Sequence, residues 1–379
     1  GNHFKTPFGH KRQLKYRIRN YLASFKRKVS NIDFDGAILS EAYANWGIND
    51  KLKEEGYKVC MLPWHADPGF RLSTEYAAVA NGLDYGDFNF LLSEYFIDRV
   101  YNFRSFFENF LQCNHIKLVI FANDMTVINR IAISACKNVG VKSMIYLHGL
   151  PAGSYNAIDN NRADYLCVWG DRMKELCVNA GVNANKVIVM GNAKYSGQKF
   201  PDTHPASFDN VLVLSRAISG APSDSVKRPI ENRGLSIDYI YMEEALKRVG
   251  VNKATLRLHP SENGEWYKKF IDSDFYTLDD KSLMDCLSDK TAIVSPASTV
   301  MFDAFLCGIP FFAFEPHTII GYEVVPPFDG SEEEMPIAKS ISELVDHLQH
   351  NIVASHALID KYINPVVDMS KIKELLPNG

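Results

Sequence analysis

Short apolar runs that alternate with helical patterns are the feature that most restricts the fold of this chain. Runs such as LVIFAND at 118–124 and VLVLS at 211–215 have the length of buried strands, and segments with apolar residues at helical spacing follow them. Strands and helices that alternate in this way form parallel βαβ units. The sequence therefore predicts an α/β protein built on parallel sheets.

The alternation occurs in two series, separated by a polar stretch rich in Gly and Pro that is typical of a linker. The chain has 379 residues, which is more than one ordinary core accommodates. We predict two Rossmann-like domains that face a cleft. The expected division is a basic arm at 1–30, a first domain at 31–195, a linker at 196–209, a second domain at 210–339, and helices at 340–379 that could cross back to the first domain.

Candidate functional residues are those that directly follow strands, because open α/β sheets bind ligands beside the carboxyl ends of their strands. In the second series, His259-Pro260 ends the strand-like ATLRLHP. Pro260 fits the first turn of a helix, where its missing N–H costs nothing, so the proline needs no functional explanation. His259 could donate a hydrogen bond to a phosphate or could be structural, and the residues leave both open.

The same series contains TAIVSPASTVMF, in which a buried strand ends at Ser295 and a helix starts near Ser298-Thr299. Ser and Thr are ordinary helix caps. The same geometry collects backbone N–H groups, hydroxyls and the positive helix end at one point, which suits an anion. The two interpretations are compatible.

In the first series, His148-Gly149 follows the strand-like SMIYL, and Asn123-Asp124 follows LVIFA. His148 is a functional candidate by its position at a strand end. Asp124 could act as a base, but a cap for the helix that begins at Thr126 is the favoured interpretation.

Several familiar motifs are missing. The sequence has no GxxxxGK[ST] loop, no GxSxG elbow, no HExxH and no kinase signature, and the Gly-containing loop at 215–225 lacks GxGxxG. Metal-ligand spacing is missing as well, so we expect no metal and no bound cofactor. The formal net charge of −4 gives the molecule no overall attraction to nucleic acid.

The N-terminal stretch from Lys11 to Lys28 carries basic residues interleaved with apolar ones and no acidic residue. It could lie on an anionic membrane surface or be a solvated arm. The sequence shows no run of 18 apolar residues and no signal-peptide pattern, and its seven cysteines form no CxxC pair. We expect reduced thiols and a cytoplasmic protein that could be peripheral on the inner membrane.

A strand ending in His-Pro, followed later in the same domain by Ser-Thr at a helix start, resembles the bacterial GT-B glycosyltransferases that use cytidine-activated donors. These include the sialyl-, polysialyl- and β-Kdo transferases and, more distantly, the CDP-glycerol polymerases. The matching residues are His259-Pro260 and Ser298-Thr299. The His-Gly of YLHGLPAG is similar to a loop of the teichoic acid polymerases. The acidic motif of the sialyltransferases has only an imperfect match, at Asp33-Phe34-Asp35-Gly36.

The resemblance implies a GT-B enzyme that moves an acidic keto sugar, of the Kdo or sialic acid type, from CMP to a bacterial surface glycan. His259, Pro260, Ser295, Ser298 and Thr299 would bind the nucleotide, on the second domain.

The first domain would bind the acceptor, a glycan or glycolipid. In an inverting reaction, Asp124 or His148 would take the proton from the acceptor hydroxyl. In a retaining reaction a carboxylate would attack the sugar, and Asp224 in the 215–225 loop is the candidate; its alternative interpretation is a plain loop acid. A polyol-phosphate transferase that uses a CDP-glycerol-type donor, and a non-catalytic binding protein, are the other hypotheses.

Overall fold

The computed structural model divides the chain into two compact α/β units. Unit 1 comprises 1–148, 156–196 and 366–379, and unit 2 comprises 149–155 and 197–365. The residues whose structure is described are 32–41, 47–66, 71–85, 88–124, 126–150, 163–215, 229–259, 264–316 and 325–376. The predicted arm at 1–30 lies outside them.

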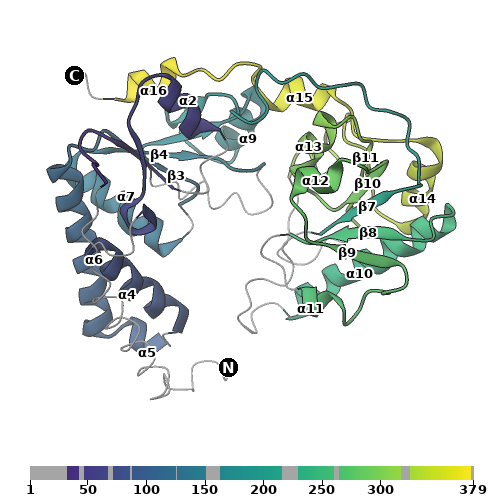
Figure 1. The fold of residues 1–379 in the computed structure, drawn as a ribbon, viewed down its shortest axis with the longest axis horizontal. Helices are drawn as coiled ribbons and strands as arrows, with labels where there is room; N and C mark the ends of the chain where they lie inside the picture. Colours follow the sequence, from purple (N-terminus) through teal and green to yellow (C-terminus); the bar gives the residue numbers. More distant parts are fainter. Residues whose placement is uncertain are drawn as a thin grey trace. The chain divides into compact units, whose positions relative to one another are not determined.

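Unit 1 contains a six-stranded sheet in the order β2-β1-β3-β4-β5-β6, in which each described strand pair is parallel (Figure 1). Its strands are β1 (Ile38–Ser40), β2 (Val59–Met61), β3 (Leu118–Phe121), β4 (Lys142–Tyr146), β5 (Tyr165–Val168) and β6 (Val187–Val189). The chain adds β2 on one side of β1 and then adds β3 on the other. The direction of winding therefore reverses between β1 and β3, which makes this pair the topological switch point of the sheet.

Most helices of unit 1 connect consecutive strands along the chain, as a parallel sheet requires. They are α2 (Ile48–Glu54), α3 (Pro63–Ala66), α4 (Arg71–Tyr85), α5 (Phe88–Leu91), α6 (Glu94–Cys113), α7 (Val127–Val139), α9 (Asp171–Asn179), the 3₁₀ turn η2 (Ala184–Lys186) and α16 (Ser370–Leu375). The side chain of Ser93 caps α6 by accepting a hydrogen bond from the N–H of Phe96. Phe96, Phe103, Phe107 and Phe110 recur at helical spacing and are buried.

Unit 2 contains a second six-stranded sheet, in the order β12-β11-β10-β7-β8-β9, again with parallel pairing of the described strands (Figure 1). Its strands are β7 (Val211–Leu214), β8 (Ala254–Arg257), β9 (Tyr276–Asp279), β10 (Ala292–Ser295), β11 (Phe311–Phe314) and β12 (Ile337–Ala338). The winding direction reverses between β7 and β10. This pair is the switch point of the second sheet.

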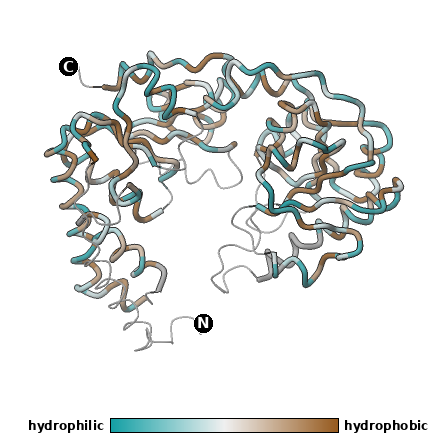
Figure 2. Tube along the Cα trace, in the orientation of Figure 1, coloured by the Kyte–Doolittle hydropathy of each residue, from teal (hydrophilic) through white to brown (hydrophobic). Residues whose placement is uncertain are grey.

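The helices of unit 2 are α10 (Pro229–Arg248), α11 (Gly264–Tyr267), α12 (Leu283–Leu287), α13 (Val300–Leu306), α14 (Ile341–His350) and α15 (Ala357–Tyr362). The buried aromatic residues Tyr239, Tyr267 and Phe275 belong to a core that includes residues of β7, β8, β10 and β11. Hydrophobic residues are prominent in the strands of both sheets (Figure 2). Each aromatic side chain that is fully buried stabilises the folded state by about 1.5–3 kcal/mol relative to an exposed one.

Among the described residues, none of the helices has the length and apolar content needed to cross a membrane. The seven cysteines are present as thiols. Burial raises the pKa of the Cys167 thiol to about 12 and that of Cys286 to about 11. Both thiols are therefore protonated, and thus weakly nucleophilic, at neutral pH.

Candidate functional site

The switch point of unit 1 brings Glu41, which follows β1, beside Ala122, which follows β3. The side chain of Glu41 is 8% exposed. Its Oε2 atom accepts a hydrogen bond of 2.8 Å from the N–H of Ala122 and one of 3.1 Å from Nδ2 of Asn129. These donors hold a carboxylate at the edge where sheets of this kind bind ligands.

Asn129 on α7 fixes the turn between β3 and α7. Its Nδ2 also donates to the carbonyl of Asn123 at 2.8 Å. The helix cap is Thr126, whose hydroxyl accepts from the N–H of Asn129 at 3.1 Å. The N–H of Thr126 in turn donates to Oδ1 of Asn123 at 3.3 Å. The favoured interpretation of Asp124 as the cap of this helix is therefore wrong, because Thr126 has that role.

Asp124 itself is 4% exposed, and its carbonyl accepts a hydrogen bond of 2.9 Å from Nε of Arg130. The carbonyl of Asp124 thus bonds the turn after β3 to Arg130 of α7. A side chain so deeply buried has limited access to a substrate hydroxyl, whereas His148 is exposed.

His148 follows β4, the strand next to β3. Its Nδ1 atom lies 3.2 Å from the carbonyl oxygen of Ala122. A carbonyl oxygen only accepts hydrogen bonds, so this contact requires the proton on Nδ1. In the neutral ring the basic nitrogen is then Nε2.

His65 adds a second imidazole at the same edge, since it lies in α3 just after β2. Its ring packs edge-on against Tyr76, with 5.7 Å between the ring centroids. Partial burial lowers the pKa of His65, and the negative charge of Glu41 raises it by a smaller amount. The carboxylate of Glu41 therefore acts electrostatically on His65. It also bonds the N–H of Ala122, whose carbonyl oxygen bonds His148.

The carboxyl edge of the unit 2 sheet brings together Ser215 after β7 and His259 after β8. The N–H of His259 donates to the hydroxyl oxygen of Ser215 at 2.7 Å. The N–H of Ser215 donates to the carbonyl of Arg257 at 3.0 Å. These two bonds extend the pairing of β7 and β8 beyond the strands and fix the main chain of His259 at the sheet edge.

On the other side of β7, the predicted Ser-Thr helix start follows β10. Helix α13 begins at Val300, with Thr299 as its N-cap residue, but Thr299 makes no side-chain capping bond. The hydroxyl oxygen of Ser298 instead accepts from the N–H of Val300 at 3.2 Å. Ser295 is fully buried, and its hydroxyl donates to the carbonyl of Pro296 at 2.7 Å. Ser295 therefore shapes the turn that presents Ser298 and Thr299.

Glu315, which follows β11, supports this turn from the neighbouring strand. It is 7% exposed, and one carboxylate oxygen accepts a hydrogen bond from the N–H of Ala297. Its own N–H donates to the carbonyl of Ala338 at 2.9 Å. The Ser-Thr turn is thus anchored by a buried carboxylate that the sequence analysis did not identify.

Two of the predicted site residues, Asp224 and Pro260, lie outside the described residues. The imperfect acidic match at 33–36 precedes β1 and so lies at the amino end of the sheet. Asp33 forms an ion pair with Lys58, and Asp35 lies 2.7 Å from Nδ1 of His115. This motif is therefore not one of the groups at the carboxyl edge.

Sequence reasoning missed Glu41, His65, Ser215 and Glu315. Each lies at or just after the end of a strand, but its contacts are with residues of other elements, which the sequence alone does not show. Among the described residues, no group of three or more His, Cys, Asp or Glu side chains could hold a metal ion.

A scan against protein-family models and a search of curated proteins each found no match. Solved structures do share the fold. A glycosyltransferase from Rickettsia africae ESF-5 has a TM-score of 0.52 and 11% identity, over 91% of this chain and 100% of that chain. MnaA from S. aureus, solved with UDP, has a TM-score of 0.50 and 13% identity, over 89% and 95%.

At such identities the likeness establishes the fold. The chain has the GT-B fold, with two Rossmann-like α/β units, as the alternation in its sequence predicts. The fold alone does not determine the activity, which depends on the residues at the carboxyl edges of the two sheets.

Proposed function

We propose that this chain is a glycosyltransferase that moves an acidic keto sugar, of the Kdo or sialic acid type, from its CMP conjugate to a bacterial surface glycan. The observation that carries the proposal is the arrangement at the carboxyl edge of the unit 2 sheet, around its first strand β7. There, His259 and the Ser298-Thr299 turn follow β8 and β10, the two strands that flank β7. This is where sheets of this kind bind nucleotides.

The spacing of these groups suits a nucleotide phosphate. Neighbouring strands are about 4.8 Å apart, so the ends of β8 and β10 lie roughly 10 Å from each other. His259 would hydrogen-bond the phosphate from one side. Ser298 and Thr299 would bind it from the other and stabilise the negative charge that grows as CMP leaves.

On unit 1, His148 is the proposed general base for an inverting reaction. Its Nδ1–H is bonded to the carbonyl of Ala122, which assigns the basic nitrogen to Nε2. An exposed imidazole with this tautomer can take a proton from an acceptor hydroxyl. The deep burial of Asp124 favours His148 over Asp124 for this role. Asp224 stays the candidate nucleophile for a retaining reaction.

The cytidine assignment rests on the resemblance of His259-Pro260 and Ser298-Thr299 to the cytidine-dependent transferases. Uridine is the competing nucleotide, because the fold is also that of MnaA, which was solved with UDP. A polyol-phosphate transferase with a CDP-glycerol-type donor is the alternative activity. His148 and His259 would then both act on phosphate.

A nucleotide panel tests the proposal. Wild-type protein is titrated with CMP, CDP, UMP and UDP, and both the melting temperature and the Kd are measured. A ligand that binds the folded state alone stabilises it by about 2.7 kcal/mol at a concentration 100 times its Kd. We expect CMP to raise the melting temperature more than UMP does. Stabilisation by UMP or UDP but not by CMP contradicts the cytidine assignment.

Turnover separates the two candidate activities. CMP released from CMP-Kdo or CMP-sialic acid in the presence of a glycan acceptor supports glycosyl transfer, whereas release from CDP-glycerol alone supports polyol-phosphate transfer. A glycolipid acceptor would place the enzyme at the cytoplasmic face of the inner membrane. The basic stretch at 11–28 could then attach it to anionic lipids.

A further inference from the structure

Glu41 is a buried carboxylate at the switch point of unit 1 to which neither the sequence analysis nor the proposed mechanism gives a role. It follows β1 directly and is 8% exposed. Its bonds to the described residues come from a main-chain N–H and a side-chain amide. A carboxylate is an expensive group to bury for structural purposes alone, because its desolvation must be repaid by such bonds.

A short chain of hydrogen bonds connects Glu41 to His148 through one residue. The N–H of Ala122 donates to Oε2 of Glu41 at 2.8 Å, and the carbonyl of the same residue accepts from Nδ1 of His148 at 3.2 Å. The position of Ala122 thus depends on Glu41, and the orientation of the His148 ring depends on Ala122.

Asn129 makes this arrangement stiff. Its amide donates both to Glu41 and to the carbonyl of Asn123, so the turn after β3 is held from β1 and from α7 together. The contact between Asn129 and Glu41 joins residues 88 positions apart in the chain.

The chemistry requires a carboxylate rather than an amide at position 41. Ala122 and Asn129 both present N–H donors to the same oxygen, and a carboxylate has acceptor capacity on both of its oxygens. Nδ2 of Asn129 lies 3.1 Å from Oε2 and 3.4 Å from Oε1, so in either orientation the amide NH2 group of a glutamine would face this donor in place of an acceptor. Substitution by glutamine therefore disturbs the turn without changing side-chain volume.

We propose that Glu41 is a positioning residue that holds His148 in the Nδ1–H tautomer, with Nε2 as the basic nitrogen. The inference deepens the proposed function, since that tautomer is the one the general base uses. Glu41 acts through the main chain of Ala122. The carbonyl of Ala122 is the hydrogen-bond partner of Nδ1, and a partner on one ring nitrogen determines the protonation of the other nitrogen.

NMR of the histidine rings tests this without any substrate. The wild-type protein, Glu41→Gln and Glu75→Gln are labelled with ¹⁵N, and two-bond ¹H–¹⁵N spectra are recorded at a pH where His148 is neutral. A His148→Gln spectrum assigns the signals. Glu75 is the matched control, because it is a carboxylate of unit 1 with the same 8% exposure and pairs with Arg99 on α6.

The wild type should show the Nδ1–H tautomer at His148, and Glu41→Gln should change the tautomer ratio at least threefold toward Nε2–H. Glu75→Gln should leave it unchanged. An Nε2–H tautomer in the wild type overturns the proposal whether or not the variants fold. An unchanged ratio in folded Glu41→Gln, or an equal change in both variants, also overturns it.

Transfer kinetics give the functional readout. We expect Glu41→Gln to lower kcat on the order of 10²-fold, as a misplaced base does, with little change in the KM for the donor. A raised donor KM with kcat unchanged contradicts the proposal. If the wild type transfers no sugar from any nucleotide donor, the proposed function fails, while the NMR result still decides the relation between Glu41 and His148.

Discussion

Both sheets reverse their winding direction beside their first strand, β1 or β7, but the residues at their carboxyl edges differ in chemistry. In unit 1, the strand ends carry a buried carboxylate and two imidazoles: Glu41, His65 and His148. In unit 2, they carry hydroxyl groups and one imidazole, Ser215, Ser298, Thr299 and His259, while the buried carboxylate of Glu315 bonds the main chain of the Ser-Thr turn. The first set is suited to moving a proton and the second to binding an anion. The fold thus provides two equivalent edges, and the side chains that follow the strands decide what each edge does.

The largest effect expected from this comparison is on catalysis through unit 1. His148→Gln should lower the kcat of sugar transfer by about 10²- to 10⁴-fold, because the variant lacks the proposed general base. The Kd for CMP should stay the same, since the proposed nucleotide site is in the other unit. Stopped assays of CMP release and calorimetric titration measure the two quantities.

His115→Gln is the control for this variant. His115 is an exposed histidine of unit 1 that pairs with Asp35 at the amino edge of the sheet. It should retain wild-type kcat. Loss of CMP binding in His148→Gln would contradict the division of roles between the two edges.

The next effect should be on nucleotide binding through unit 2. His259→Ala should weaken CMP binding by roughly 10- to 100-fold, the value of one hydrogen bond to a charged group. The matched control is His350→Ala on α14, where the histidine pairs with Asp346. Calorimetry on both variants gives the comparison, and equal weakening in both would indicate a general loss of structure instead.

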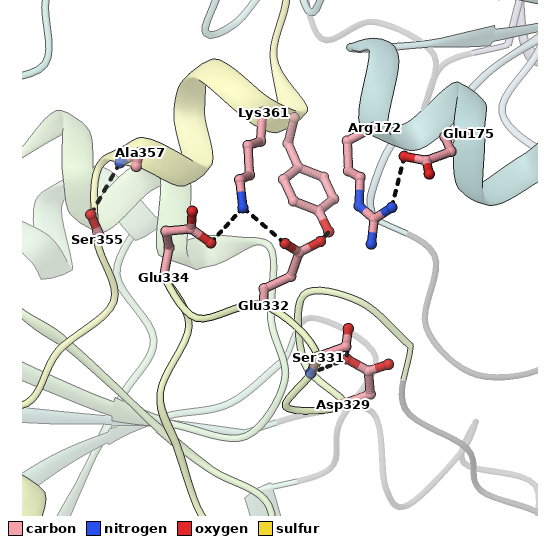
Figure 3. A network of polar contacts seen from close by, with 10 residues as sticks. Arg172, Glu175, Asp329, Ser331, Glu332, Glu334, Ser355, Ala357 and Lys361 are labelled. Carbon is pink, nitrogen blue, oxygen red and sulfur yellow. Dashed lines mark hydrogen bonds and ion pairs between the residues drawn. The ribbon is translucent and has the colours of Figure 1, made fainter.

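A third variant separates the stability of unit 2 from its chemistry. Figure 3 shows Lys361 donating to both Glu332 and Glu334, at 3.1 and 2.6 Å. The hydroxyl of the buried Tyr362 also donates to Glu332, at 2.9 Å. Glu332→Ala removes the hydrogen bonds that this carboxylate accepts from Tyr362 and Lys361 and should cost about 1–3 kcal/mol of unfolding free energy. Denaturant titration measures this, and the CMP affinity of the folded variant should be unchanged.

The smallest expected effect concerns the pH dependence of stability in unit 1. Partial burial holds the pKa of His65 below its ordinary value of 6.5, so the unfolded chain takes up this proton first as the pH falls. The contribution of His65 to the free energy of unfolding is complete above pH 6.5 and decreases as the pH falls from 6.5 toward the pKa of the folded state. His65→Gln should flatten the unfolding free energy between about pH 7 and 5. An unchanged slope would show that another group titrates there.

The strands and several helices could be predicted because their signals are local. The pattern TVINRIAISACKNVG predicts a helix that is found as α7, with Thr126 and Gly140 at its two ends. The helical layer from α3 to α6 was not predicted, although Ser93 provides a cap. The buried face of α6 is rich in phenylalanine, a residue enriched in strands, so only the helical spacing of these residues indicates a helix.

The candidate site was predictable at His148 and at the Ser298-Thr299 turn, because both directly follow clear strands. Glu41 was not, since its importance comes from Asn129, which lies 88 positions further along the chain. The choice of Asp124 as a cap failed for a local reason. Two neighbouring residues could cap α7, and the local geometry gives that role to Thr126.

The central claim is that the switch point of unit 2 binds the cytidine nucleotide. Backbone chemical-shift mapping of deuterated, ¹⁵N-labelled protein titrated with CMP tests it most directly. The account predicts the largest shifts at Ser215, His259, Ser298 and Thr299. Saturable shifts confined to the carboxyl edge of the unit 1 sheet, with these four residues unaffected, would contradict it.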